Sequence, residues 1–386
     1  MPLDPSFVAD PYPTFAAMRN EREVLWHEEL GLPVAVSHAA CSAILRNRSL
    51  GRLWKDKEPV PEFAAFNMLH RNSLLENEPP THTRLRRLIS AAFGRGHTER
   101  LRPMVERLAS SMVASMVARI EAEGSADLLE HLAEPLPVEV IGELLGVPPE
   151  DRGLLRPWSN AIVKMYEYGL SPAQAAAAEQ ASSEFSQYLR ALATRPGDNL
   201  ISDLVAVRDG SDRLTDDELV ATGVLLLMAG HEATVNVIGN GVLALLLNRD
   251  QWDLLVATPS LLPSAVEELL RYDAPLQLFE RTATAPVSIA GWELEPGAKI
   301  AALLGAAARD PEVFAEPDRF DITRSPNPHL SFGAGIHYCV GAPLARVEIA
   351  AALQALVQLP TLHLATEPAR RPEFVIRGLR TLPVAV

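Results

Sequence analysis

Cysteine is scarce in this chain, which has only Cys41 and Cys339 among 386 residues. Two cysteines cannot build a disulfide framework. A long uninterrupted apolar run is missing too, because polar residues break the most apolar segment, 224–247, at His231, Glu232, Asn236 and Asn240. No membrane-spanning helix is therefore predicted. The opening residues, MPLDPSFVADPYPTF, lack the charged and then apolar pattern of a signal peptide. We expect a soluble, cytoplasmic protein that is not associated with a membrane.

Basic residues are in the minority, with 35 Lys and Arg against 49 Asp and Glu and a formal net charge of −14. This balance argues against general nucleic-acid binding. Because no block of like charge stands out, the acidity indicates solubility and leaves room for a local basic patch that meets a small acidic partner. The 48% hydrophobic content is enough for a large buried core.

Strand patterns are few and helical periodicity dominates. Apolar residues recur at three- and four-residue steps in 85–93, and helices are also predicted over 103–122, 136–146, 174–194, 216–248 and 262–272. Strands are predicted around 34–36 and within 281–303, with a turn near 295–297. The segment 309–330 is rich in Pro and Asp and lacks periodicity, which indicates a long ordered loop. Because loops of this length are uncommon in compact domains, we expect the loop to have a functional role. No shift in composition marks a linker, so we expect one mostly helical domain over 1–386.

The segment 329-HLSFGAGIHYCVGAPLARVEIAAAL-353 surrounds the second cysteine. Gly333 and Gly335 bracket a tight turn that needs positive φ or close approach to something flat. Cys339 comes just before a predicted helix, whose N-terminal N–H groups would stabilise a thiolate. Such a thiolate, with glycines clearing the space above it, suits a large metal cofactor. A lone cysteine is otherwise a small buried hydrophobe, and we assign that role to Cys41.

The run FGAGIHYCVG resembles the haem-binding signature of the cytochrome P450 superfamily. The match comprises Phe332, Gly333, Gly335, His337, Cys339, Gly341 and 344–346. The resemblance covers nearly the whole chain and is greatest to soluble bacterial members of the actinobacterial type. It implies a mainly α fold, with a large helical domain and a small β-rich region. It also implies haem b, iron protoporphyrin IX, with Cys339 as the axial thiolate that favours O–O cleavage.

The motif 267-EELLRY-272 contains Glu268 and Arg271 on one helix face. It resembles the family's Glu-x-x-Arg pair, and 317-PDRF-320 supplies Arg319 as the arginine expected from the later loop. The resemblance implies that these three residues lock the fold near the cysteine, so their predicted role is structural.

Cations are expected where haem propionates are partly buried. His82 and Arg86 share a face of the helix after Pro80, and the resemblance implies that they bind propionates together with Arg281 and His337. Plain solvation is the alternative for such a basic helix face. Arg84 and Arg87 point elsewhere and could meet an acidic electron donor.

The stretch 225-LLLMAGHEATVN-236 begins like a zinc-protease motif, but Val235 stands where the second His would be needed. It resembles instead the oxygen-binding part of the family's central helix. Small residues, Ala229 and Gly230, would pass close over the haem, and Glu232 would relay protons.

The usual threonine after this acid is replaced by Ala233, and Thr234 is one step further, about 100° around the helix. Three routes stay open: a substrate hydroxyl or ordered water replaces the threonine, Glu232 acts alone, or the reaction is not a plain hydroxylation.

The resemblance also implies a partly aromatic substrate pocket. Its lining would come from the loop 63–75, from the segment 158–168 with Tyr166 and Tyr168, and from Leu225, Met228, Ala229, Ala233, Leu276, Gln277, Leu278 and Phe279. Any one of these could instead be ordinary core.

The implied function is a monomeric monooxygenase of secondary metabolism. It would insert one atom of O₂ into a small organic substrate with electrons from a ferredoxin and its reductase. One alternative is a haem-thiolate enzyme that performs aryl coupling, desaturation or a peroxide-driven oxidation, which Ala233 keeps open. The other is a haem-binding sensor or carrier without turnover, against which Glu232 speaks.

Overall fold

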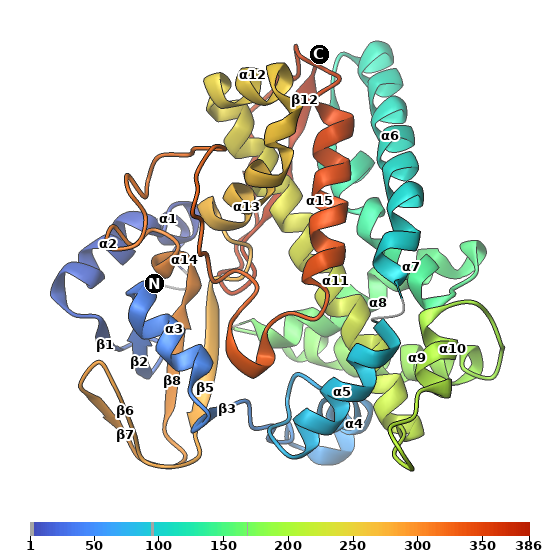
Figure 1. Ribbon diagram of the computed structural model, residues 1–386, viewed down its shortest axis with the longest axis vertical. Coiled ribbons are helices and arrows are strands. Elements are labelled where there is room, and N and C mark those ends of the chain that lie inside the picture. The colour runs from blue at the N-terminus through green and yellow to red at the C-terminus, as the bar shows by residue number, and fades with distance from the viewer. Residues whose placement is uncertain (1–3, 94–95, 168) are drawn as a thin grey trace. The chain divides into compact units, whose positions relative to one another are not determined.

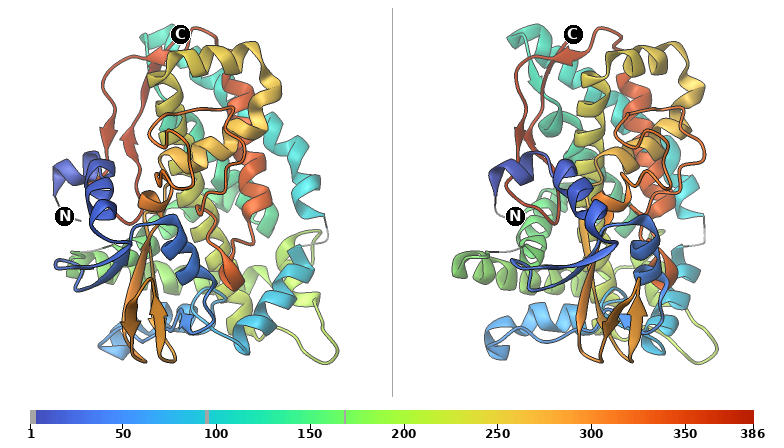
Figure 2. Two further views of the ribbon diagram at one scale, coloured as in Figure 1. Left: turned by 60° about the vertical axis from the view of Figure 1, so that its left-hand side comes forward. Right: turned by 90° about the vertical axis from the view of Figure 1, so that its left-hand side faces the viewer.

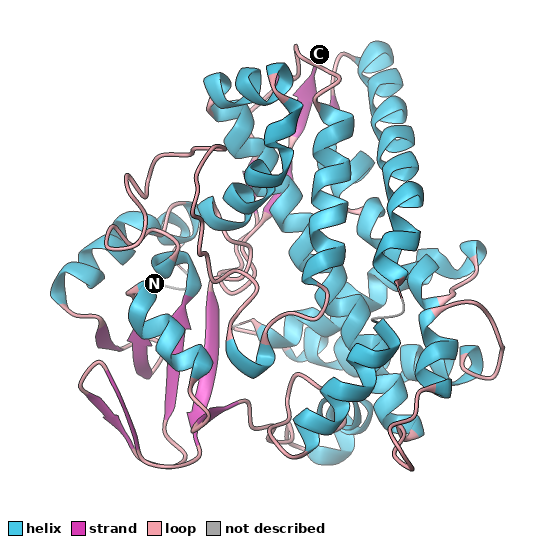
Figure 3. Ribbon diagram, viewed as in Figure 1, coloured by secondary structure: helices cyan, strands magenta, loops and turns pink. Residues whose placement is uncertain are grey.

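The computed structural model describes residues 4–93, 96–167 and 169–386 (Figure 1). They divide into two compact units. The first unit comprises Met1–Gly51, Glu106–Pro135 and Ala233–Val386, and the second comprises Arg52–Val105 and Leu136–Glu232. Helices predominate and strands are few (Figure 3), so the predicted mainly α class is confirmed. The expectation of a single domain stays a prediction.

The first unit contains a five-stranded sheet in the order β1-β2-β8-β5-β3. Its strands are β1 (Val24–His27), β2 (Leu32–Ala35), β3 (Leu50–Gly51), β5 (Leu278–Ala283) and β8 (Lys299–Leu303). β2 runs parallel to β8, and the other neighbours are antiparallel. β5 and β8 lie side by side in both views of Figure 2, in register from Leu278–Leu303 to Thr282–Lys299. The strands predicted around 34–36 and within 281–303 are therefore confirmed.

Short helices and small ribbons complete the first unit. Its helical elements are α1 (Pro5–Ala9), α2 (Tyr12–Glu21), α3 (His38–Arg46), η2 (Leu129–Ala133), α12 (Arg249–Ala257), η5 (Pro259–Leu261), α13 (Leu262–Tyr272), α14 (Leu304–Ala307), η6 (Gly335–His337) and α15 (Ala342–Leu356). A three-stranded sheet joins β4 (Ala126–Asp127), β12 (Pro383–Ala385) and β9 (His363–Leu364). Two further ribbons pair β6 (Val287–Ile289) with β7 (Trp292–Leu294), and β10 (Ala369–Arg370) with β11 (Leu379–Thr381).

The described part of the second unit is helical. It contains η1 (Val60–Phe63), α4 (Ala64–Arg71), α5 (Thr81–Phe93), α7 (Pro135–Leu145), η3 (Pro149–Leu154), α8 (Leu155–Val163), η4 (Lys164–Tyr166), α9 (Pro172–Leu192) and α10 (Leu200–Ala206). α9 begins with a capping box of Ser171 and Gln174, which satisfies two N-terminal donors. Trp158 of α8 stacks on Phe185 of α9 with 5.0 Å between ring centroids. All the helices predicted from periodicity are present within a few residues of their expected ends.

Two long helices have residues in both units, α6 (His97–Glu123) and α11 (Asp216–Leu247). Thr215 caps α11: its hydroxyl accepts from the Glu218 N–H, and its own N–H donates to the Glu218 carboxylate. By length and composition α11 could cross a membrane, which the sequence did not predict. Its most apolar window is 78% buried, as expected of a core helix in a folded protein.

Asp273, at the end of α13, joins three distant segments of the first unit. It accepts hydrogen bonds from the Tyr12 hydroxyl (2.6 Å), Arg377 Nε (2.7 Å) and Arg370 Nη2 (3.0 Å). Arg377 also donates to the carbonyl oxygens of Val8 and Ala9. Burial alone would raise the pKa of Asp273, but the charges of Arg377 and Arg370 outweigh it and hold the pKa well below its usual range.

We predict that Asp273→Asn lowers the free energy of unfolding at pH 7 by about 3–5 kcal/mol, because two arginines lose a buried partner. A carboxyl whose pKa is lowered on folding stabilises the protein fully above its unfolded pKa of about 3.9 and loses this contribution progressively as the pH falls from there toward the lower pKa of the folded state. The difference between native protein and variant should therefore shrink as the pH falls below about 4. Urea unfolding followed by circular dichroism at pH 7 and pH 3.5 measures both effects.

Glu316→Gln is the matched control, since its ion pair with Arg319 is exposed to 73% and 56%. Its unfolding midpoint should equal that of the native protein. An unchanged midpoint for Asp273→Asn would contradict the stabilising role of the cluster.

Candidate functional site

The two cysteines occupy opposite environments. Cys41 lies in α3 within a buried apolar cluster, and its thiol donates to the carbonyl oxygens of Ala35 (3.3 Å) and Leu303 (3.6 Å). Burial raises the pKa of Cys41 far above its ordinary value, so this thiol stays protonated. Cys339 is only half-buried. The predicted structural role of Cys41 is therefore confirmed, and Cys339 remains as the candidate for chemistry.

Glycines shape the loop that carries Cys339. Gly333 and Gly335 have φ values of 71° and 70°, as the sequence predicted. A Cβ on Gly335 would lie 2.5 Å from the carbonyl oxygen of Leu45, at the end of α3. The loop closes on itself, because the Cys339 N–H donates to the carbonyl oxygen of Phe332 at 2.9 Å. No other residue type fits at position 335 without moving α3 or the loop.

The sulfur of Cys339 lies beside the start of α15. Gly341 is the N-cap of this helix, and a Cβ built on it would be 3.9 Å from Sγ. The first N–H groups of a helix have no partner within it, and together with the helix dipole they lower the pKa of a nearby thiol. The described residues contain no cluster of three or more His, Cys, Asp or Glu side chains that could hold a metal ion. A single thiolate donor fits a metal whose other ligands come from a cofactor.

Three residues predicted to contact a cofactor, and one predicted to line the substrate pocket, collect around this loop in the first unit. Phe279 of β5 lies against Gly333, where a Cβ would be 3.8 Å from its ring and 3.7 Å from the His337 carbonyl oxygen. Arg281, two residues along the same strand, has its guanidinium carbon 5.8 Å from the centre of the Phe279 ring. Phe279, Arg281, Gly333 and His337 therefore form one neighbourhood with Cys339.

Two residues of the predicted pocket segment 276–279, Gln277 and Leu278, belong to the core instead. The Gln277 side chain is 0% exposed, donates to the Ala274 carbonyl oxygen at 2.6 Å, and occupies the space beside Gly305. Leu278 is 5% exposed within an apolar cluster of the first unit. The predictions for Gln277 and Leu278 were therefore wrong, whereas Leu276 and Phe279 are only partly buried.

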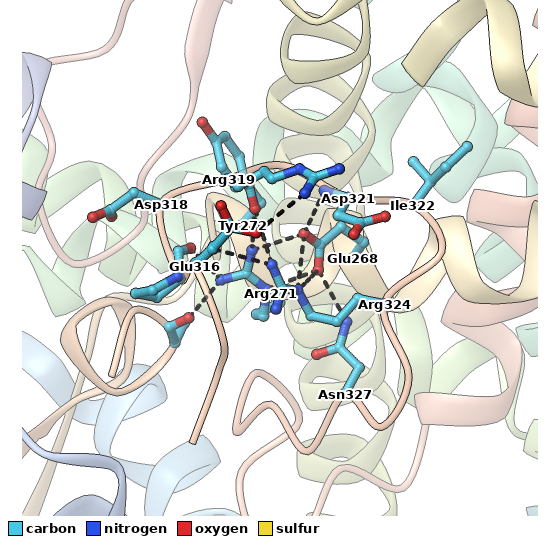
Figure 4. Close-up of polar contacts among 12 residues, drawn as sticks. Glu268, Arg271, Tyr272, Glu316, Asp318, Arg319, Asp321, Ile322, Arg324 and Asn327 are labelled. Atoms are coloured by element: carbon cyan, nitrogen blue, oxygen red, sulfur yellow. Dashed lines mark hydrogen bonds and ion pairs between the residues drawn. The ribbon is translucent and has the colours of Figure 1, made fainter. Parts of the chain in front are cut away.

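The buried pair Glu268 and Arg271 has the predicted geometry. Arg271 donates from Nε to Oε2 at 2.8 Å and from Nη2 to Oε1 at 2.7 Å, and both side chains are 0% exposed. Figure 4 shows the loop wrapped around this pair. Glu268 also accepts from the Asp321 N–H (2.9 Å) and from Asn327 Nδ2 (3.1 Å).

The third member of this cluster is Arg324, and the prediction of Arg319 was wrong. Arg324 Nε lies 3.3 Å from Glu268 Oε2, with its side chain 10% exposed. Arg319 contributes only its carbonyl oxygen, which accepts from Arg271, while its side chain pairs with Glu316 in solvent. Sequence spacing could not choose between two arginines five positions apart in an aperiodic loop.

α11 presents an accessible face in the middle of an otherwise buried stretch. Leu225 and Ala233 are half-buried and Ala229 is exposed, whereas Met228 and Thr234 are buried. Positions 225, 229 and 233 lie one turn apart on one face. The accessible side chains at 229 and 233 are small. The helix is continuous here, so Thr234 points away from that face.

His231 and Glu232 of this stretch belong to the second unit and lie near Ser159 of α8. His231 Nδ1 lies 3.3 Å from Ser159 Oγ and 3.9 Å from Glu232 Oε1, and all three side chains are buried. Gly230 lies against α7, because a Cβ there would be 2.8 Å from Ile141 Cδ1. Ser159 and Glu232 thus both lie beside the same nitrogen of His231.

α5 carries the remaining predicted cofactor residues in the second unit. His82 is buried and Arg86 half-buried, four residues apart on one face. Arg84 pairs with Asp212 (3.2 Å) and Glu218, and Arg87 pairs with Asp209. Arg84 and Arg87 thus have acidic partners within the unit, and their role toward an external electron donor stays a prediction. In the segment 158–168, Tyr166 is half-buried and donates to His70 Nε2 at 2.8 Å, whereas Tyr168 lies outside the described residues.

Comparisons with known proteins agree on one family, and the similar proteins cover nearly the whole chain. The cytochrome P450 family model matches residues 250–378. Cytochrome P450 monooxygenase PikC of Streptomyces venezuelae is 41% identical, covering 99% of this chain and 92% of the relative. 6-Deoxyerythronolide B hydroxylase of Saccharopolyspora erythraea is 38% identical over 98% of this chain and 96% of the relative. The crystal structure of P450BioI with an acyl carrier protein that carries hexadec-9Z-enoic acid has a TM-score of 0.92 at 33% identity, covering 98% of each chain.

We predict that Gly335→Ala lowers the thermal midpoint and the fraction of protein that binds its cofactor, because the methyl group meets the Leu45 carbonyl oxygen. Gly291→Ala is the matched control: its φ is +78°, with no atom within 4 Å of the added Cβ. The control should suffer only the backbone strain of positive φ, about 1–2 kcal/mol. Equal behaviour of the two variants in thermal unfolding and in absorbance of bound cofactor would contradict the close fit between loop and α3.

Proposed function

Since the chain belongs to the cytochrome P450 family and is a haem-thiolate monooxygenase, we propose that Cys339 is its axial ligand and that the cofactor is haem b. The supporting observation is the contrast between the two thiols: Cys41 is enclosed in the core, whereas Cys339 lies at a helix N-terminus within a glycine-shaped loop. A thiolate-bound haem iron supplies the activation of O₂ by favouring O–O cleavage.

Four donors are proposed for the two propionates. Arg281 and His337 belong to the neighbourhood of Gly333, and His82 and Arg86 share a face of α5. A guanidinium can donate two parallel hydrogen bonds to a carboxylate, and an imidazole N–H can donate one. In this proposal the four residues orient the haem, while Phe332, Gly333 and Gly341 shape the loop beside it.

The substrate is proposed to be a small apolar natural product of polyketide type, oxidised in secondary metabolism. Two similar proteins bear names that point this way, 6-deoxyerythronolide B hydroxylase and polyketide biosynthesis cytochrome P450 PksS of Bacillus subtilis. In this proposal apolar contacts come from Leu225 and Ala229 of α11 in the second unit and, in the first unit, from Leu276 and Phe279. Titration with macrolactones and, for contrast, steroids tests this through the Soret shift. A shift with steroids alone would contradict the polyketide class.

Proton delivery is proposed to run along Ser159, His231 and Glu232. These groups are buried, and one atom, His231 Nδ1, lies 3.3 Å from Ser159 Oγ and 3.9 Å from Glu232 Oε1, so a bridging water completes the proposed path between His231 and Glu232. Glu232 directly precedes Ala233, the position where the family's usual threonine is missing. A substrate hydroxyl or ordered water then fits beside the small Ala233 side chain.

Electrons are proposed to come from a ferredoxin and its reductase, with the enzyme acting as a cytoplasmic monomer. The support is the full-length similarity to bacterial relatives. Substrate-dependent NADPH oxidation with surrogate ferredoxin partners tests the donor, and light scattering tests the monomer. Turnover supported only by a flavodoxin would contradict the ferredoxin.

We predict that Cys339→Ser abolishes the red-shifted carbon-monoxide band of a ferrous haem-thiolate, because the sulfur ligand is replaced. Cys41→Ala, the control, should keep the band since its thiol lies in the core. Loss of the band in Cys41→Ala with retention in Cys339→Ser would reverse the assignment of the ligand.

We predict that Glu232→Gln slows product formation by about 10²-fold while the substrate dissociation constant stays unchanged, because it removes a proton donor and little volume. Single-turnover rates and Soret titration measure the two quantities. Glu293→Gln, a carboxyl on the exposed part of β7, should behave like the native enzyme. Native turnover in Glu232→Gln would refute the relay.

A non-hydroxylating oxidation is the second candidate, and Ala233 is the observation that favours it, because the family's usual hydroxyl is missing there. Turnover under labelled O₂ separates the two reactions: label in the product means hydroxylation, and unlabelled product means coupling, desaturation or a related oxidation. The variant Ala233→Thr adds a further distinction, since better coupling of electrons to product would argue against help from a substrate hydroxyl.

A further inference from the structure

Glu267 stands next to Glu268 in α13 but has separate partners. Arg346 of α15 donates to it from Nε at 2.6 Å and from Nη2 at 2.9 Å, which is a bidentate pair. His329 Nε2 donates to the same carboxylate at 3.1 Å. One carboxylate thus binds two segments of chain that are distant from α13 in sequence.

The two partners of Glu267 flank Cys339 in the sequence. His329 comes ten residues before the cysteine and Arg346 seven residues after it. Both ends of the cysteine segment are therefore fixed to one point on α13. A carboxylate that grips both ends of a loop restricts its motion more than two separate contacts would.

A chain of contacts leads from Glu267 to the backbone of Cys339. The guanidinium carbon of Arg346 lies 4.5 Å from the centre of the Phe332 ring, which is cation–π geometry. The Phe332 ring is also 6.0 Å from His329 and 6.3 Å from Tyr338. The Phe332 carbonyl oxygen in turn accepts from the Cys339 N–H at 2.9 Å. Displacement of Phe332 would therefore move the peptide group that carries the sulfur ligand.

The proton positions at this site follow from the geometry. The Ser331 N–H donates to His329 Nδ1 at 3.2 Å, so Nδ1 is an acceptor and Nε2 carries the proton donated to Glu267. Burial would raise the pKa of Glu267, but the hydrogen bonds from Arg346 and His329 outweigh it and hold the pKa at about 2. Glu267 is therefore charged at neutral pH, as the bidentate pair requires.

We propose that Glu267 is a positioning residue for the axial thiolate: through Arg346 and His329 it fixes the Phe332–Cys339 loop and so tunes the haem iron. The inference rests on the proposed ligation by Cys339. Residues that orient a metal ligand are a recognised means of tuning the metal, as are hydrogen bonds and charges near the sulfur. The two adjacent carboxylates thus have separate tasks, since Glu268 binds the segment around 321–327 and Glu267 binds the cysteine segment.

The test uses the haem-loaded enzyme and the variant Glu267→Gln, which keeps the size of the side chain but cannot pair with Arg346 as an anion. The ferrous carbon-monoxide form should lose its red-shifted band at least about tenfold faster, because the loop that holds the thiolate is loosened. The reduction potential should become more positive, because the positive charge of Arg346 loses its partner. Both should change at a temperature where the far-ultraviolet circular dichroism equals that of the native enzyme.

Arg346→Lys is the second variant and decides the question if Glu267→Gln does not fold. It keeps the positive charge but loses the bidentate, planar contact, so the band should again decay faster while the potential moves less. Glu316→Gln, whose ion pair with Arg319 is exposed, should match the native enzyme in both measurements.

Native decay rates and potentials in Glu267→Gln and Arg346→Lys would overturn the positioning role. A lower unfolding midpoint with both quantities unchanged would also overturn it, because that is the result of a purely structural contact. If Cys339→Ser keeps the red-shifted band, the proposed ligation fails instead, so the two failures are distinguishable.

Discussion

The loop that precedes Cys339 in the first unit depends on one buried ion pair, which joins Glu268 to Arg271. Two fully buried charges are costly unless hydrogen bonds satisfy them completely. Arg271 meets this requirement by donating to the carbonyl oxygens of Ala308 and Pro317. On the acidic side, Glu268 accepts from the backbone of Asp321 and from side chains of the same loop. The pair therefore does what a helix or strand would otherwise do for this loop: it satisfies backbone polar groups and fixes the path of the chain.

The order of this loop matters because it leads directly into the cysteine segment. Near the end of the loop, His329 donates to Glu267 of α13. Two residues later, the Ser331 hydroxyl donates to the Leu270 carbonyl oxygen of the same helix at 2.6 Å. Residues 267–271 of α13 thus bind the loop, the residues just before Cys339, and Arg346 in the first half of α15. Rigid elements place a metal ligand more accurately than loops do, and here a helix fixes the loop that carries the proposed ligand, Cys339.

Periodicity was enough to predict the helices, and the glycine pattern was enough to predict the positive φ angles at 333 and 335. Errors arose where a residue's partner is set by tertiary packing. Arg319 and Arg324 look alike in sequence, and only the folded loop shows which one reaches Glu268. Gln277 is polar, yet it fills the space beside Gly305 in the core. Glu267 and Arg346 were both visible in the motifs, but nothing in their spacing of 79 positions indicates a bidentate pair.

The proposed substrate contacts of α11 include Ala233, the position where the family's usual threonine hydroxyl is missing. Its accessible face at 225, 229 and 233 combines one Leu with two alanines, so the side chains of this face carry no hydrogen-bonding group. Thr234 carries the nearest hydroxyl on the helix, but it is 3% exposed and about 100° away around the axis. In the proposed relay, a proton from Glu232 must therefore pass to an oxygen that the accessible face does not supply. If that oxygen belongs to the substrate, the small side chain of Ala233 favours substrates that place a hydroxyl at this position. Ala233 would then determine both the substrate specificity and the route of proton delivery.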